Sequence, residues 1–308
     1  MNSSASANVL SVNGLVKSYG RHEVLRGLDL SVTRGAIHGL VGLNGSGKTT
    51  TLECLLGLQK FDAGTVHALE FQPHELHLAK GRIVAIFDTP SLNPNLTVQQ
   101  CLQQAALLCP DIHRSSSEVQ RLLDIEQYSK FRIKQLSLGN KRRVSIAQAL
   151  LGQPELILLD EPFNGLDAAG VDDVLALIKQ LNSETGTSFL LSSHQLPYLE
   201  QVCTHLAILH QGEIRVSAAV NELLQSSGTH IRLKAGDSSQ LETALSRMAE
   251  VRIEKKDESG YWQVELTSGD SATLNKALLE QGVALSELLV ENPSLEKLFR
   301  EQTQAAES

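Results

Sequence analysis

Short runs of apolar residues alternate with longer amphipathic stretches from Val9 to about Val220. The runs Leu156–Leu159 and Phe189–Leu191 are wholly apolar and have the length of strands. Such runs are typical of parallel strands that are buried on both faces. Strands that alternate with helices favour an α/β fold with a largely parallel sheet. We therefore predict one α/β domain over this part of the chain.

Turn-forming residues mark further strands at both ends of this region. Asn8–Tyr19 and Val24–Val32 are predicted strands, and the turn at Gly20-Arg21 separates them. At the other end, the apolar run Leu206–Leu209 is a predicted strand that leads into a hairpin turn at Gln211-Gly212.

The pattern changes after the polar stretch Gln225-Ser226-Ser227-Gly228, which indicates a domain boundary. We predict a first domain over residues 1–228 and a second over residues 229–308. The second is predicted to contain strand, helix, two strands, helix and strand in that order, over residues 230–234, 239–249, 251–254, 262–266, 271–281 and 284–290. This order suggests a small α+β domain of the ferredoxin-like kind. A last amphipathic helix, Ser294–Gln302, is predicted after Asn292-Pro293.

Length and charge narrow the possible partners. The 308 residues suffice for two domains, at roughly 150 residues each. The net charge is −8, from 27 basic and 35 acidic residues. Nucleic-acid-binding proteins usually have a surplus of basic residues, so we expect no nucleic-acid partner. The short basic cluster Lys141-Arg142-Arg143 is predicted to lie on a solvated helix face or at an edge that faces phosphate.

The sequence also bears on targeting and redox state. Met1–Asn8 is small and polar, so we expect no secretory signal peptide. No stretch approaches the roughly 20 apolar residues that a membrane-spanning helix needs, so the chain is not expected to cross a membrane. The four cysteines are scattered without a CxxC pair, which favours buried or free thiols in a reducing cytosol: Cys54, Cys101, Cys109 and Cys203.

The strongest chemical signal is the segment Gly42-Leu43-Asn44-Gly45-Ser46-Gly47-Lys48-Thr49, which matches the phosphate-loop pattern GxxxxGK[ST]. A predicted strand, Ile37–Val41, leads into it, and a predicted helix, Lys48–Gly57, leaves it. Glycines permit the backbone conformations that turn N–H groups toward an anion at a helix N-terminus. Lys48 is predicted to reach the β- and γ-phosphates of ATP and Thr49 to ligate Mg²⁺. We include Thr50 in the predicted ATP-binding set.

A pair of carboxylates follows the apolar run Leu156–Leu159, at the carboxyl end of that predicted strand. Ligands bind at this edge of an open α/β sheet. Asp160 is therefore predicted to hold Mg²⁺, and Glu161 to polarise the water that attacks the γ-phosphate.

With these motifs in place, the region from Val9 to about Val220 resembles the ATP-binding cassette (ABC) transporter ATPases. Tyr19 is similar to the aromatic residue that stacks on adenine in that family. Leu136-Ser137-Leu138-Gly139-Asn140 resembles the family signature, usually LSGGQ, at the start of a helix. Asn164-Gly165-Leu166-Asp167 resembles the D-loop, and His194 resembles the switch histidine.

The resemblance implies a head-to-tail dimer that encloses ATP. ATP on one subunit's phosphate loop would be completed by Ser137 and the N–H of Gly139 from the other subunit. A helix N-terminus carries about half a positive charge and free N–H donors, which suits the γ-phosphate. Because this chain has both halves, a homodimer would contain two complete sites.

Two departures from the family pattern stand out. The signature has Leu138 and Asn140 where a glycine and a glutamine are usual, but it keeps Ser137 and Gly139. The Q-loop glutamine aligns with Asp88, which we predict as a third Mg²⁺ ligand because carboxylates bind this cation. By resemblance, an acidic residue at this position favours the export branch.

The tail segment Pro293-Ser294-Leu295-Glu296-Lys297-Leu298-Phe299 is similar to the ending of drug-, polysaccharide- and sodium-export ATPases. The resemblance implies a phosphate-loop NTPase whose mostly parallel sheet is joined by an antiparallel β subdomain and a helical subdomain. It also implies a separately encoded transmembrane permease as partner. The chain would then be cytoplasmic and peripheral on the cytoplasmic face of the membrane.

Two other functions are considered. A soluble regulatory or repair ATPase could use the same cassette, but the long coiled-coil insertion of repair members and the paired cassettes of translation factors are both missing from this sequence. A nucleotide-binding scaffold with weak hydrolysis would rest on Asp88 alone, and Glu161 and His194 argue against it.

Overall fold

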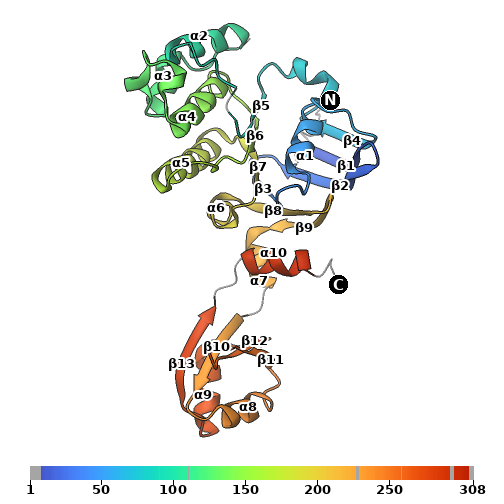
Figure 1. Ribbon diagram of the computed structural model, residues 1–308, viewed down its shortest axis with the longest axis vertical. Helices are drawn as coiled ribbons and strands as arrows, with labels where there is room; N and C mark the ends of the chain where they lie inside the picture. The colour runs from blue at the N-terminus through green and yellow to red at the C-terminus, as the bar shows by residue number, and fades with distance from the viewer. Residues whose placement is uncertain are drawn as a thin grey trace, which may run out of the picture. The chain divides into compact units, whose positions relative to one another are not determined.

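A computed structural model describes residues 8–89, 91–109, 111–226, 229–257, 259–291 and 295–304. The chain divides into two compact units, Met1–Val220 and Asn221–Ser308 (Figure 1). Ser227 and Gly228 of the predicted boundary, and Asn292-Pro293 with Ser294 before the last predicted helix, lie outside the described residues.

A six-stranded sheet forms the centre of the first unit, in the order β5-β6-β7-β3-β8-β9. Its first five strands pair in parallel and β9 pairs antiparallel to β8. The strands are β3 (Ile37–Val41), β5 (Ile83–Ile86), β6 (Leu156–Asp160), β7 (Ser188–Ser193), β8 (His205–His210) and β9 (Glu213–Ala219). Every residue of β3, β6 and β7 is buried, as expected of central parallel strands. The predicted α/β class with a mostly parallel sheet is confirmed.

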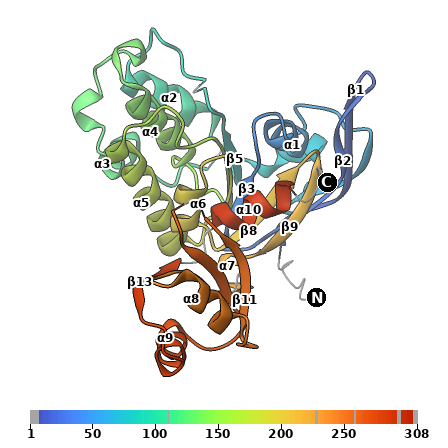
Figure 2. The ribbon, with the colours of Figure 1, turned by 60° about the horizontal axis from the view of Figure 1, so that its bottom comes forward.

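Helices cover both faces of this sheet. Figures 1 and 2 show α1 on the opposite face from α5 and α6. A separate group of helices, α2, α3 and α4, packs together as the helical subdomain. The helices are α1 (Lys48–Leu55), α2 (Val98–Leu108), α3 (Ser116–Leu122), α4 (Leu138–Ala149), α5 (Ala168–Thr185) and α6 (Leu196–Val202), with short 3₁₀ turns η1 (Pro73–Ala79), η2 (Glu126–Tyr128) and η3 (Ile133–Gln135).

Local sequence signals explain where these helices begin and end. Thr97 and Ser115 open α2 and α3 with capping boxes. In each box the side chain of the capping residue accepts from the backbone N–H three residues on, and the side chain of that later residue accepts from the backbone N–H of the capping residue. Asp167 caps α5, and Gly186 ends that helix in the left-handed conformation with φ 67°. Helix α1 ends at Leu55 rather than at the predicted Gly57, whose φ of 70° is left-handed.

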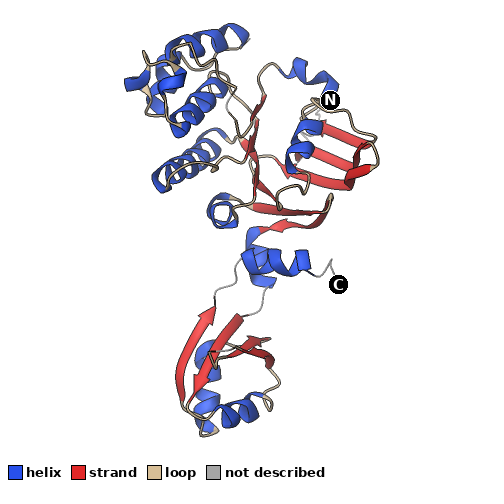
Figure 3. Cartoon of the chain, in the orientation of Figure 1, coloured by secondary structure: helices blue, strands red, loops and turns tan. Residues whose placement is uncertain are grey.

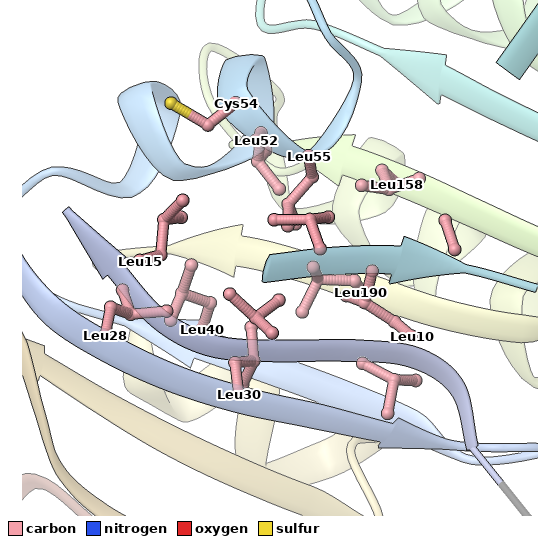
Figure 4. Close-up of a cluster of buried hydrophobic side chains, with 14 of the residues drawn as sticks. Leu10, Leu15, Leu28, Leu30, Leu40, Leu52, Cys54, Leu55, Leu158 and Leu190 are labelled. Atoms are coloured by element: carbon pink, nitrogen blue, oxygen red, sulfur yellow. The ribbon is translucent and has the colours of Figure 1, made fainter. Parts of the chain in front are cut away.

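A second, antiparallel sheet has the order β2-β1-β4, with β1 at Asn8–Tyr19, β2 at His22–Thr33 and β4 at Ala63–Ala68. One hydrophobic cluster joins this sheet to the central sheet and α1 (Figure 4). Each of its leucines is at most 3% exposed, and full burial of a leucine stabilises the fold by about 1.5–3 kcal/mol. The cluster includes Leu10, Leu15, Leu28, Leu30, Leu40, Leu52, Leu55, Leu158 and Leu190.

The second unit contains a four-stranded antiparallel sheet in the order β11-β12-β10-β13 (Figure 3). Its strands are β10 (Thr229–Ala235), β11 (Val251–Lys256), β12 (Trp262–Leu266) and β13 (Leu285–Glu291). Side chains of α8 (Ser238–Leu245) and α9 (Ser271–Glu280) share one buried cluster with the sheet. Two further helices are α7 (Val220–Ser226) and α10 (Leu295–Gln304).

All four cysteines are free, and Cys54, Cys101 and Cys203 are buried. Of the helices that the structure describes, none combines the length and the apolar character that a bilayer crossing requires.

Two histidines on neighbouring strands of the central sheet stack on each other, and one of them, His38, is buried. His38 of β3 is 4% exposed, and its ring stacks on that of His205 of β8, with centroids 4.7 Å apart and an angle of 13° between the planes. Neither ring nitrogen of His38 has a hydrogen-bond partner among the described residues. Burial, and next the neighbouring His205, lower the pKa of His38 from 6.5 to about 4.

Replacement of His38 by phenylalanine should therefore make the protein less sensitive to acid. Between pH 6.5 and about 4 the unfolded chain binds a proton at residue 38 that the folded chain does not, so the free energy of unfolding falls as the pH falls. The ring of His38→Phe keeps the stacking and removes about 2 kcal/mol of the loss between pH 7 and pH 4.5. Urea titrations at the two pH values measure it. His67→Phe, at an exposed position of β4, should leave the loss unchanged. An unaltered loss in His38→Phe would contradict the assignment.

Candidate active site

The phosphate-loop segment connects β3 to α1 in a conformation that requires its glycines. A Cβ on Gly42 would lie 2.3 Å from Ser46 Oγ and 2.6 Å from the Leu209 carbonyl oxygen. Gly45 and Gly47 have φ of 82° and 108°, where an L side chain is strained. Gly47 is also the N-cap of α1, so the unpaired N–H groups of the first helical turn begin at this loop.

Lys48 lies inside the loop and is 6% exposed. Its Nζ donates hydrogen bonds to the carbonyl oxygens of Gly42 at 2.7 Å and Leu43 at 3.3 Å. The same nitrogen is 3.3 Å from Glu161 Oε1, at the end of β6. The ammonium group therefore lies between the loop and the carboxylate, at a position from which it could bind a phosphate group above the loop.

Asp160 is the last residue of β6 and is 5% exposed. Its Oδ2 accepts a hydrogen bond from Thr49 Oγ1 at 3.1 Å, and its Oδ1 accepts one from Ser192 Oγ. The β6–β7 register pairs Asp160 directly with Ser192, which explains why these side chains meet.

The donor set at Thr49 and Asp160 fits Mg²⁺, because a hydroxyl and a carboxylate oxygen are the hard ligands that this cation prefers. Within the described ranges, no group of three or more His, Cys, Asp or Glu side chains forms a metal site. A cation held by one or two protein oxygens, water and nucleotide phosphates agrees with this finding.

Glu161 has a hydrogen-bond or ionic partner at every polar atom. Its Oε2 is 3.0 Å from His194 Nδ1 and accepts from Ser193 Oγ at 3.2 Å, while Oε1 faces Lys48. Its N–H donates to the Ser192 carbonyl at 2.9 Å, and its own carbonyl accepts from the Asn164 N–H at 3.1 Å. The residue has φ 46°, in the left-handed region that non-glycine residues rarely occupy.

These residues surround a cavity of about 600 Å³. Sequence analysis predicted most of the lining, but it did not assign Val24 of β2 or Asn164 to the site. The complete lining is Val24, Asn44, Gly45, Gly47, Lys48, Thr49, Thr50, Asp88, Asp160, Glu161, Asn164 and His194.

Six predicted nucleotide contacts do not line the cavity: Tyr19, Gly42, Leu43, Ser46, Ser137 and Gly139. Tyr19 ends β1, is 46% exposed, and has Lys17 Nζ 4.6 Å from its ring centroid. Ser137 is the exposed N-cap of α4, where its Oγ accepts from the Asn140 N–H at 3.3 Å.

The signature packs against the segment that follows Glu161. A Cβ on Gly165 would lie 2.6 Å from Leu138 Cδ2, so the unusual Leu138 sits over a glycine. A Cβ on Gly139 would lie 3.4 Å from Leu166 Cδ2. Leu138, the departure from the family signature, thus has a packing role in this chain.

Asp88 lines the cavity, but its carboxylate is bonded to neither Thr49 nor Asp160, the residues that fit Mg²⁺. Arg142 Nη2 is 3.2 Å from Asp88 Oδ1, and Asn164 Nδ2 donates to Oδ2 at 3.4 Å. The metal-ligand role of Asp88 stays a prediction from sequence.

The predicted solvated position of the basic cluster is wrong for Arg142, which is 2% exposed. Its Nη1 donates to the Glu161 carbonyl at 2.5 Å and its Nη2 to the Asp88 carbonyl at 2.8 Å. The helical period could have indicated this, because Arg142 lies three and four residues before the buried Ser145 and Ile146 of α4.

Comparison with known proteins agrees with this geometry. The sequence profile of the family described as "ABC transporter" matches residues 25–164. The bacitracin transport ATP-binding protein BcrA of Bacillus licheniformis is 30% identical over 297 residues, which cover 95% of this chain and 96% of that protein. The Nod factor export ATP-binding protein I of Ralstonia nicotianae is 32% identical and covers 82% of this chain and 81% of its own length.

A solved structure titled "Structure of ATP binding subunit of ABC transporter" has a TM-score of 0.65 and 27% identity, and it covers 71% of this chain and 92% of that one. Together with the near-complete match to a relative at 30% identity, this places the whole cassette in one family. The chain belongs to the ABC transporter family as one of its ATP-binding, ATP-hydrolysing subunits.

Proposed function

We propose that this subunit binds ATP with Mg²⁺ in the cavity, dimerises around the nucleotide and hydrolyses it to drive a separately encoded export permease. The observation that carries the proposal is the convergence of Lys48, Asp160, Glu161 and His194 on one cavity at the carboxyl ends of parallel strands. The subunit would work on the cytoplasmic face of the membrane.

The phosphates of ATP would lie over the glycine loop, at the N-terminus of α1. Lys48 would exchange part of its contacts with the Gly42 and Leu43 carbonyls for phosphate oxygens. Thr49 and Asp160 would hold Mg²⁺, which neutralises charge on the phosphates when bound. Tyr19, exposed at the end of β1, would stack on adenine.

For hydrolysis, Glu161 would orient a water molecule in line with the γ-phosphate and accept its proton. The water oxygen bonds to the γ-phosphorus, the bond from that phosphorus to the bridging oxygen breaks, and ADP and phosphate result. Ser193 and His194 hold Oε2 of Glu161, which fixes the direction of the carboxylate.

The composite site would form when a second subunit brings its signature to the γ-phosphate. Ser137 and Gly139 stand at the N-terminus of α4, outside their own subunit's cavity. This position suits donors that act on a nucleotide bound elsewhere. Export as the direction of transport is supported by the relative named for Nod factor export.

The first test removes the two groups at the centre of the chemistry. Lys48→Ala should bind ATP weakly and lose turnover, because the phosphate charge loses its buried cation. Glu161→Gln should bind ATP and lose about 10²–10⁴-fold in rate, because an amide accepts no proton. Phosphate release and nucleotide titration measure both effects. Glu184→Gln, at an exposed position of α5, should turn over normally. Full activity in Glu161→Gln would falsify its role.

The second test examines the composite site. Ser137→Arg should still bind ATP but not hydrolyse it, because the new side chain blocks the sandwich. Mixing it with excess Lys48→Ala protein should restore part of the activity, since one site in each mixed dimer keeps both intact halves. Ser183→Arg, exposed on α5, should retain the full rate. If confirmed mixed dimers show no rescue at any ratio, the sandwich is wrong.

The third test concerns the second unit, to which we assign a tuning role. All residues that line the cavity lie between Val24 and His194, within the first unit. A chain that ends at Ser227 should therefore still bind ATP, but dimerise less readily and hydrolyse at an altered rate. Light scattering and phosphate release compare it with the full chain. Identical behaviour of a soluble truncated chain would refute the tuning role.

A further inference from the structure

Arg142 is a buried cation beside the active site that the proposed mechanism does not use. Burial lowers the pKa of its guanidinium, and the Asp88 carboxylate opposes that shift. Its two terminal nitrogens point to different segments, one to the Glu161 carbonyl and the other to Asp88. Burying a cation here costs desolvation free energy, which only well-made hydrogen bonds offset. A role for the Arg142 side chain at this position would explain why the chain bears that cost.

The contact with Glu161 falls where the chain has an unusual conformation. At φ 46° the direction of the Cα–Cβ bond, and with it the carboxylate, depends on how the flanking peptides are held. The peptide that follows Glu161 is fixed by two donors on its carbonyl oxygen, Arg142 Nη1 at 2.5 Å and the Asn164 N–H at 3.1 Å. Arg142 is the only side chain among the described residues that donates to this carbonyl.

Asp88 closes a ring of contacts around the same atoms. Its Oδ1 faces Arg142 Nη2 at 3.2 Å, and its Oδ2 accepts from Asn164 Nδ2 at 3.4 Å. Asn164 in turn donates its backbone N–H to the Glu161 carbonyl. Asp88, in the segment after β5, thus contacts both residues that donate to the Glu161 carbonyl oxygen.

We propose that Arg142 is a positioning residue that fixes the main chain of Glu161. Asp88 acts as the counter-ion of Arg142 and not as a ligand of Mg²⁺. A guanidinium suits this task because its N–H groups lie on separate nitrogens in a rigid plane and reach two acceptors in fixed directions, whereas the donors of an ammonium share one nitrogen and rotate. The loop that carries Asp88 would then set the direction of the Glu161 carboxylate through Arg142. This inference rests on the proposed role of Glu161 in hydrolysis.

The test compares variants of the ion pair with a neighbouring control. Arg142→Met should lower kcat by about 10–100-fold, because small displacements of a catalytic group are costly, and leave the Kd for ATP almost unchanged. Arg142→Lys should recover part of kcat. Arg143→Met is the control: Arg143 pairs with Asp173 and the Leu123 carbonyl, so kcat should stay near the wild-type value.

Asp88 variants separate the counter-ion role from a metal-ligand role. Asp88→Asn keeps an acceptor for Arg142 and should lose less kcat than Asp88→Ala, and in both variants the Mg²⁺ concentration for half-maximal rate should match the wild type. A raised Mg²⁺ requirement, with kcat restored in excess Mg²⁺, would overturn the counter-ion role and make Asp88 a metal ligand.

Single-turnover hydrolysis shows whether Arg142 acts through Glu161. In the Glu161→Gln background, Arg142→Met should slow the residual reaction little further, since the group it positions is already gone. An equal loss in both backgrounds would refute the proposal. If Arg142→Met fails to fold, as judged by thermal melting, Arg142→Lys and Asp88→Asn decide the same question. Full activity in Glu161→Gln would defeat the proposed function, whereas a Glu161→Gln protein that loses its rate as expected, together with a fully active Arg142→Met, would defeat this inference alone.

Discussion

The parallel pairing of β3, β6 and β7 is the constraint on which the active site depends. Because the three strands run side by side in the same direction, their carboxyl ends meet at one edge of the sheet. The phosphate loop leaves β3, Asp160 ends β6 with Glu161 directly after it, and Ser193 ends β7 with His194 directly after it. A shift of one residue in the β6–β7 register would separate Asp160 from Ser192 and turn the carboxylate to the other face.

Burial makes this arrangement demanding. Lys48 and Glu161 are 6% and 12% exposed at their side chains, and a buried ion pair is tolerated only when its remaining polar atoms are satisfied. Lys48 meets that condition with two loop carbonyls, and Glu161 meets it with Ser193 and His194. The same partners fix the positions of both side chains at the edge of the cavity.

The sequence predicted those parts of the molecule that depend on local signals. Wholly apolar runs marked the central strands, and the glycine spacing marked the phosphate loop whose conformation requires it. The surroundings of Arg142 could not be predicted in this way. Its contacts span 54 residues to Asp88 and 19 residues to Glu161, and they depend on side-chain packing between separate elements. A charged triplet on a helix is usually solvated, and tertiary packing overrode that tendency at one position.

Glu161 is therefore held by two independent sets of contacts. Its carboxylate is bound by groups that face the nucleotide cavity, while its carbonyl is bound by Arg142 and Asn164, which belong to neighbouring segments. A change at either set alters the same residue, but through different atoms. In the proposed mechanism a nucleotide would act on the carboxylate directly, whereas movement of α4 or of the Asp88 loop would act on the main chain. If hydrolysis requires both sets of contacts, the residue proposed to orient the water would also respond to the position of α4.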